Sequence, residues 1–140
     1  MHILVSPQWV RRLLSHEVSW LLARLLLTSA YVLGGVTKVL NWPAALAEQA
    51  SFGLSPPNIW AAITVTVELG GSLLLLIGRG VWLAAGALGV FTFFAAILAN
   101  AFWLADHGPG RFSATNAFFE HLGLVGGFIL AAMVANQKQT

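Results

Sequence analysis

A single carboxylate, Glu68, interrupts the long apolar run between residues 64 and 77. If this run crosses a membrane, Glu68 lies near the middle of the bilayer, where an ionised side chain needs a partner, polar surroundings or a proton. Thr64 and Ser72 lie one helical turn to either side, so this face of the helix is polar. Glu68 is therefore our first candidate for proton chemistry, and the fold must bring polar partners towards it.

Arg24 is the cation best placed in depth to pair with Glu68. At about 1.5 Å of rise per residue, Arg24 lies roughly 6 Å inside one membrane boundary and Glu68 roughly 14 Å, a difference that a guanidinium group can span. We predict that Glu68 faces the protein interior and bonds Arg24, directly or through one water. Arg24, Tyr31 and Lys38 also follow one stripe, because residues seven apart lie on nearly the same helix face.

A second group of polar residues falls near the opposite membrane boundary. Together with Tyr31, the candidate ligand-binding residues are Lys38, Asn100, Trp103, Glu120 and His121. A simpler interpretation stands beside this one: Arg24 and Lys38 can extend to the membrane surface, and Glu120 and His121 can lie at the interface. Glu68 has no such alternative, because neither end of its helix is within its reach.

The composition indicates the environment of this protein. Of its 140 residues, 58% are hydrophobic and 9% charged, and the mean hydropathy is +0.80, whereas soluble domains are typically about one quarter charged. These values predict an integral membrane protein. The absence of cysteine excludes thiol chemistry and thiolate ligation by this chain, and no metal site is expected. The seven basic residues are spread along the chain, which argues against nucleic-acid binding.

Four apolar segments predict an all-α fold, an integral membrane four-helix bundle. They cover approximately residues 20–40, 58–77, 81–104 and 117–134. Each has about the 20 residues that a hydrocarbon core of roughly 30 Å requires. The turn at residues 78–80 is short enough to make the middle two helices an antiparallel hairpin. Proline and glycine signals predict a short interfacial helix in the first outer connector, residues 41–57, and residues 105–116 form the second outer loop.

Charges and tryptophans orient this bundle. Arg11, Arg12, Arg79 and Lys138 fall on one side of the predicted spans, so both termini are predicted to be cytoplasmic. Tryptophans are expected at both membrane interfaces. At or near the predicted boundaries, the cytoplasmic ones are Trp9, Trp20 and Trp82, and the outer ones are Trp42, Trp60 and Trp103.

We divide the chain into three parts. Residues 1–18 form a cytoplasmic juxtamembrane arm, in which we expect an amphipathic surface helix. Residues 19–134 form the four-helix membrane domain, and residues 135–140 form a cytoplasmic tail. The expected location is the bacterial cytoplasmic (inner) membrane.

Several motifs together resemble one family. They are Arg24, Gly34-Gly35 and Lys38 in helix one, the Pro56-Pro57 break, Glu68-Leu-Gly-Gly in helix two, Phe102-Trp103, and Gly126-Gly127-Phe in helix four. This pattern, which extends over residues 20–134, resembles the DoxX family of small four-helix membrane proteins. Two positions depart from it: Asn100 stands where a histidine often precedes the tryptophan, and Glu120-His121 replaces a common Lys-Asn pair.

The resemblance implies an association with sulfur and quinone redox metabolism, in which family members act as small membrane subunits beside soluble redox partners. No self-sufficient catalytic motif and no covalent cofactor is expected, and the candidate ligand is a quinone or a lipid. A single histidine within the spans cannot provide bis-histidine haem ligation, so a bound quinone or a partner's cofactor must carry any electrons. Glu68 and Arg24, with Tyr31 nearby, are the candidate catalytic residues for proton exchange.

The alternative function is non-catalytic. A small membrane subunit can anchor, assemble or scaffold a larger complex through its helix faces. The expected partners are the lipid bilayer, other membrane or redox subunits, or further copies of the chain in a homo-oligomer. A transporter is less favoured, because the four spans contain no clear inverted repeats or interrupted helices.

Overall fold

A computed structural model describes residues 5–138, and these residues form helices and turns without a β-strand. Four helical segments are long and apolar enough to cross a membrane, which confirms the predicted fold class. They are Glu17–Leu40, Pro57–Ile77, Val81–Leu104 and Pro109–Gln137. Two short helices accompany them: α1 (Gln8–Ser15) precedes the first span, and α3 (Trp42–Ser51) follows it.

The first span is one helix, α2 (Glu17–Leu40), and α3 begins almost where it ends. The Asn41 side chain accepts a hydrogen bond from the Ala44 backbone N–H at 3.3 Å, and Pro43 occupies the first turn. Both features favour the start of a new helix. The short helix expected in the first connector is therefore present, and Pro56 and Pro57 then introduce the second span.

The second span is one continuous helix whose middle is π-helical. It consists of α4 (Pro57–Val65), a π-helical segment η1 (Thr66–Gly71) and α5 (Ser72–Ile77). The sequence pattern predicts a regular helix here. The difference matters because π turns are rare and frequently occur at functional sites, and Glu68 lies within this one.

A tight reversal joins the second and third spans, as predicted. Gly78 ends α5 with a φ of 75°, and Gly80 precedes α6 (Val81–Ala99) with a φ of 58°. Positive φ values are readily adopted only by glycine, so these two residues make the hairpin compatible with so short a turn.

The third and fourth spans have other helix boundaries than those predicted. The α-helix of the third span ends at Ala99, and a short 3₁₀ helix η2 (Phe102–Leu104) follows Asn100. The final helix, α7 (Pro109–Gln137), begins earlier than residue 117 and continues beyond residue 134. Hydropathy marks only the membrane-embedded part of a helix, whereas backbone hydrogen bonding continues into its polar ends. Much of the predicted loop 105–116 is therefore helical.

The core lies where α2, α5, α6 and α7 meet. Its buried residues are Tyr31, Leu75, Ala84, Ala85, Leu88 and Phe128. One glycine of each Gly-Gly pair allows a close helix contact: an added Cβ would lie 2.6 Å from Leu69 at Gly35, 2.9 Å from Leu88 at Gly71 and 3.0 Å from Leu27 at Gly127. Within lipid the hydrophobic effect does not drive helices together. Close van der Waals packing at small residues stabilises their association instead.

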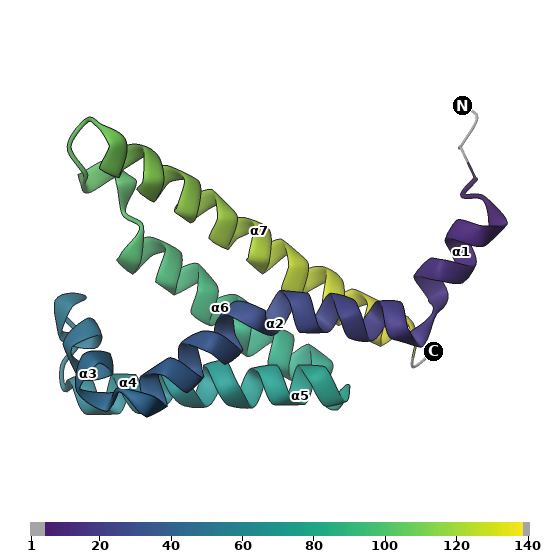
Figure 1. Ribbon diagram of the computed structural model, residues 1–140, viewed down its shortest axis with the longest axis horizontal. Coiled ribbons are helices and arrows are strands. Elements are labelled where there is room, and N and C mark those ends of the chain that lie inside the picture. Colours follow the sequence, from purple (N-terminus) through teal and green to yellow (C-terminus); the bar gives the residue numbers. More distant parts are fainter. Residues whose placement is uncertain (1–4, 139–140) are drawn as a thin grey trace.

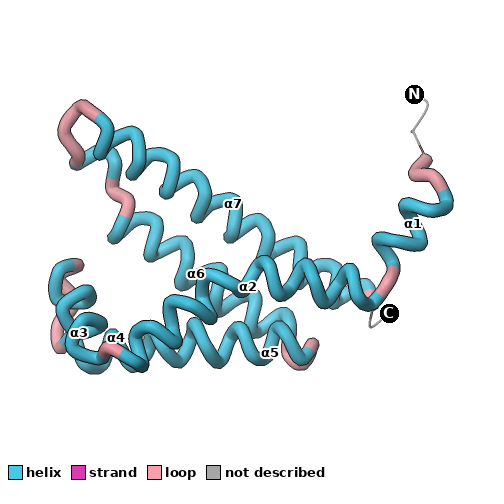
Figure 2. The backbone as a smooth tube through the Cα atoms, in the orientation of Figure 1, coloured by secondary structure: helices cyan, strands magenta, loops and turns pink. Residues whose placement is uncertain are grey.

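The helices do not stay packed along their full length. Figure 1 shows the α6–α7 pair diverging from α2 and α4 towards the end that carries α3, and Figure 2 shows that few loop residues connect the spans. At the other end, Lys138 at the end of α7 lies 3.0 Å from the Glu17 carboxylate at the start of α2. The start of the first span and the end of the last therefore share one end of the bundle.

Candidate functional site

Glu68 lies at the centre of a chain of three charged side chains. Its Oε1 atom accepts a hydrogen bond from Lys38 Nζ at 3.3 Å, and Lys38 Nζ lies 3.6 Å from Glu48 Oε2. Lys38 comes from the last turns of α2, Glu48 from α3 and Glu68 from η1. We call these three residues the Glu48–Lys38–Glu68 triad.

The triad leads from the surface into the protein. The exposed fraction of the side chain falls from 44% for Glu48 to 15% for Lys38 and 8% for Glu68. This confirms that Glu68 faces the interior of the bundle. The buried carboxylate thus has a charged connection to the exterior, which lowers the cost of its burial.

The backbone around the triad leaves room for the ion pair. A Cβ added to Gly34 would lie 3.2 Å from Glu68 Oε1 and 3.5 Å from Lys38 Nζ. The neighbouring glycine, Gly35, meets Leu69 and brings α2 close to η1. The Gly34-Gly35 pair therefore has two functions: one residue accommodates the carboxylate and the other sets the distance between the helices.

Two polar atoms beside the ion pair are buried without a hydrogen-bond partner: Glu68 Oε2 and Ser72 Oγ. Thr64, on the same face, is also buried, so the predicted polar stripe of Thr64, Glu68 and Ser72 lies in the interior. An unpaired buried acceptor costs about 1–3 kcal/mol. The second oxygen of Glu68 can therefore accept a hydrogen bond from a ligand or a water, or it can bind a proton.

The predicted direct pair between Glu68 and Arg24 is not formed in the described part of the chain. Arg24 Nη1 donates instead to the backbone carbonyl of Leu75 at 3.0 Å, and its guanidinium lies 5.2 Å from the centre of the Trp20 ring. Leu75 lies in the last turn of α5, where its carbonyl also accepts from the Gly78 backbone N–H at 3.3 Å and where the helix dipole favours a cation. The predicted depth of Arg24 in the membrane was compatible with two acceptors, the Glu68 carboxylate and a carbonyl group at the end of α5.

Tyr31 is buried in the core rather than placed in the triad. Its hydroxyl group is hydrogen-bonded to the Thr92 hydroxyl group, which itself donates to the Leu88 carbonyl. The ring makes edge contacts with Phe91 and Phe128. Because its polar atom is satisfied within the protein, Tyr31 links α2 to α6.

The predicted second cluster is not assembled as one site. In the part of the chain that the structure describes, no hydrogen bond or ion pair joins Lys38 to Asn100, Glu120 or His121. His121 Nδ1 is bonded to the Ala117 carbonyl of its own helix, and Glu120 is exposed.

The remaining candidates lie at the far ends of α6 and α7. Asn100 is half-buried where α6 ends, and Trp103 packs on Phe102 and Phe118 with 47% of its surface exposed. Figure 1 shows the α6–α7 pair diverging from α2 at this end. Among the described residues of the predicted cluster, Lys38 is the one that bonds Glu68. Among residues 5–138, no three His, Cys, Asp or Glu side chains form a group that can hold a metal ion.

Sequence reasoning missed Glu48. Only residues within the four spans were considered as charge partners, and Glu48 lies in the connector. A usable signal was present: Glu48 is the only acidic residue of residues 41–57, in a connector that starts directly after the helix bearing Lys38. A helix that folds back over the end of the bundle can return such a residue to that lysine.

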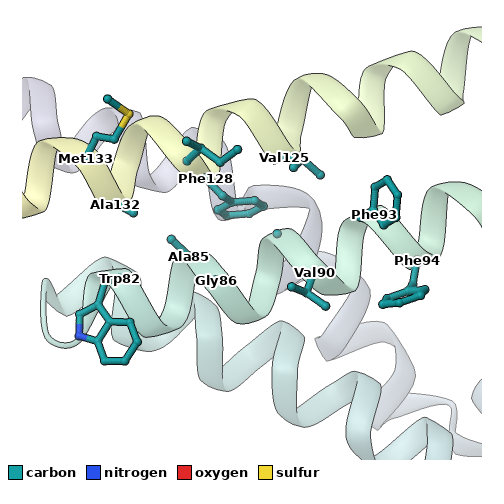
Figure 3. A pocket seen from close by; sticks show the side chains of 12 residues that line it. Trp82, Ala85, Gly86, Val90, Phe93, Phe94, Val125, Phe128, Ala132 and Met133 are labelled. Atoms are coloured by element: carbon teal, nitrogen blue, oxygen red, sulfur yellow. The ribbon is translucent and has the colours of Figure 1, made fainter.

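A separate apolar groove of about 590 Å³ lies on the face shared by α6 and α7. Figure 3 shows Trp82, Val90 and Phe94 on α6 and Val125 and Met133 on α7 along it. Small residues, Ala85, Gly86 and Gly89, form its floor on α6. Such a surface suits lipid chains or a neighbouring helix.

Comparison with known proteins identifies the family but no individual relative. No curated protein and no solved structure matches the chain significantly. The sequence model described as DoxX matches residues 19–101, which cover nearly all of the first three spans and the whole triad. This agrees with the resemblance found in the motifs and with the four candidate membrane helices. The chain is a multi-pass membrane protein that belongs to the DoxX family.

Proposed function

We propose that this protein is a small membrane subunit of a quinone-linked redox assembly, in which Lys38 and Glu68 receive the quinone head group. The observation that carries the proposal is the buried Glu68 Oε2 atom, which has no partner within the protein and lies beside a cation. Buried ionisable groups within membranes mark proton or ligand sites by default.

The residues present fit a quinone head group in both redox states. Lys38 donates hydrogen bonds, as the carbonyl oxygens of the oxidised head group require, and Glu68 accepts them, as the hydroxyl groups of the reduced form require. When bound, a quinone supplies two-electron, two-proton redox chemistry. The chain itself has no cysteine, so electrons enter from a partner subunit that carries its own cofactor.

Glu48 supplies the connection to water in this proposal. Its carboxylate is 44% exposed and lies 3.6 Å from Lys38 Nζ. Lys38 passes a proton to Glu68, Glu48 passes its own proton to Lys38, and Glu48 then takes up another from water, so one proton enters for each one delivered. Membrane sites that exchange protons use similar chains of ionisable groups.

The proposed membrane is the bacterial cytoplasmic membrane, with the triad towards its outer face. This placement follows from the basic residues Arg11, Arg12 and Arg79, which favour the cytoplasmic side. α3 and Glu48 then lie at the opposite side.

Photocrosslinking tests the head-group site directly. The protein in nanodiscs is labelled with an azido-substituted short-chain benzoquinone, with decylubiquinone as competitor, and the labelled peptides are mapped. We expect competable labelling near Lys38 and Glu68. Lys38→Met and Glu68→Gln should each reduce it by about tenfold to a hundredfold, because a charged hydrogen bond is worth about 1.5–3 kcal/mol.

Glu120→Gln is the matched control, since it removes an exposed carboxylate on α7 and should leave labelling unchanged. Labelling that decylubiquinone does not compete, or that persists equally in the Lys38 and Glu68 variants, would contradict the quinone site.

A second candidate function, a non-catalytic anchor, is favoured by a different observation. α7 has 29 residues, but the structure buries only Phe128, Ala131 and Ala135 of them, and the α6–α7 groove faces outward. A transmembrane helix of a partner subunit fits this apolar surface. Gly86→Leu fills the groove, whereas Gly123→Leu changes an exposed glycine of α7 outside it. If the anchor function holds, only Gly86→Leu releases the partner from complexes extracted with mild detergent.

A further inference from the structure

The N-terminal helix α1 (Gln8–Ser15) has no buried residue. Its apolar side chains extend away from the bundle: 69% of Trp9, 58% of Leu13 and 71% of Leu14 is exposed. Figure 1 shows α1 turning away from the axis of α2, to which it is joined at His16. Such a helix is unstable in water on its own, because so short a helix depends on packing of its apolar face.

The two faces of α1 are completely separated. At about 100° per residue, the apolar side chains occupy about 140° of arc and the polar ones about 100° on the opposite side. The apolar set is Trp9, Val10, Leu13 and Leu14, and the polar set is Gln8, Arg11, Arg12 and Ser15. The polar set lines one shallow surface hollow.

The two arginines flank the polar face rather than occupying its centre. Arg11 lies about 50° to one side of the middle of this face and Arg12 about 50° to the other. In a helix that lies flat at a membrane surface, these are the positions level with the phosphate groups of the lipids. α1 contains no acidic residue that could neutralise them.

One hydrogen bond ties the end of α1 to the first span, and a second caps the first turn of that span. Ser19 Oγ donates to the Leu13 carbonyl at 2.6 Å, and the His16 side chain accepts from the Val18 backbone N–H at 3.2 Å. The elbow between α1 and α2 is therefore a built feature. It joins the arm directly to the end of a helix long enough to span the membrane, where such a helix is expected to reach the lipid head groups.

The same end of the bundle carries further positive charge. Arg79 is exposed in the turn between the second and third spans, whereas the charge of Lys138 is paired with Glu17. Anionic lipids attract such basic residues by about 1 kcal/mol for each one close to the surface. The end of the protein that carries α1 is thus suited to a negatively charged leaflet.

We propose that α1 is a binding surface for anionic phospholipids: its apolar face enters the leaflet, and Arg11 and Arg12 bind the phosphodiester groups on either side. Two features favour anionic lipids as the ligand. The arginines of α1 complement the negative phosphate groups, and α1 directly precedes a membrane-spanning helix. The surface is separate from the triad, so it holds whether or not the quinone proposal does.

Spin labelling of the whole protein tests the proposal. Because the sequence has no cysteine, a single introduced cysteine is the only site that takes the label. Leu14→Cys reports on the apolar face and Ser15→Cys on the polar face. The accessibility of each label to oxygen and to a water-soluble nickel chelate is compared in nanodiscs of phosphatidylcholine with and without phosphatidylglycerol. With phosphatidylglycerol, the label at residue 14 should be shielded from nickel and the label at residue 15 should remain accessible.

Arg11→Gln with Arg12→Gln should lower the ratio of inserted to exposed label about thirtyfold in phosphatidylglycerol, which corresponds to about 1 kcal/mol per arginine. Arg111→Gln is the control. Arg111 lies in the first turn of α7, far from α1, so this variant should leave the ratio unchanged. The difference between the two lipids should shrink at high salt.

The proposal is wrong if the label at residue 14 stays accessible to nickel in both lipids, if the two lipids give the same accessibility, or if the arginine double variant does not weaken insertion. Shielding of the label at residue 14 from nickel in native membranes but not in nanodiscs would also overturn the proposal. Such a result would mean that a protein, and not lipid, covers α1.

Discussion

Lys38 Nζ lies 3.3 Å from Glu68 Oε1, and this contact joins the last turns of the first span to the π turn in the second. Glu48 approaches the same lysine from α3. One cation therefore pairs with one buried and one exposed carboxylate. The arrangement fastens the short connector helix to the bundle and leaves the second oxygen of Glu68 without a protein donor.

The two halves of the triad should differ in their effect on stability. Lys38→Met leaves Glu68 buried without its cation and should lower the free energy of unfolding by on the order of 3 kcal/mol. Glu48→Gln removes only an exposed partner and should cost less than about 1 kcal/mol. Unfolding in mixed detergent micelles measures both. A larger cost for Glu48→Gln than for Lys38→Met would contradict this account.

Arg24 and Glu68 should behave as independent sites. Leu75, the acceptor for Arg24, lies seven residues beyond Glu68, about 10 Å along a helix. Arg24→Gln should cost about 1.5–3 kcal/mol through the lost charged hydrogen bond. In the double variant with Glu68→Gln, the two costs should add within about 0.5 kcal/mol. A larger coupling energy would revive the direct pair that the sequence predicted.

Gly35 and Gly126 should respond differently to the same substitution. Gly35→Ala brings a methyl group within 2.6 Å of Leu69, and such overpacking typically costs about 1–3 kcal/mol. Gly126→Ala meets no atom within 4 Å, so the better helix propensity of alanine should make it neutral or stabilising. Thermal unfolding of the two variants in the same detergent provides the comparison. Equal effects would argue against a close contact between α2 and η1.

The orientation of the protein is open to a labelling experiment. Single cysteines at Ser51 in α3 and Ser113 in α7 should react with an impermeant maleimide from outside the cell. A cysteine in place of Arg79 should react only after the membrane is opened, because basic loops stay cytoplasmic. All three positions are exposed. Reaction of residue 51 or 113 only from the cytoplasmic side would reject the orientation.

Hydropathy and turn residues alone determined the architecture of this protein. The four spans follow from the number of consecutive apolar residues, and the hairpin follows from the glycines at residues 78 and 80. Both rest on local physics, since lipid demands a minimum helix length and positive φ angles demand glycine. The burial of Glu68 was equally predictable, because a mid-span carboxylate has no other tolerable place.

Only the tertiary structure decided which charges meet. Lys38 and Arg24 are both cations on one helix, and their partners depend on how far α2 slides against α5 and on where the connector helix folds back. These are non-local quantities: Arg24 meets a carbonyl 51 positions away, and Lys38 meets a carboxylate 30 positions away. Helix periodicity specifies a face and a depth, but the acceptor at that depth is supplied by a neighbouring helix and by its local π geometry.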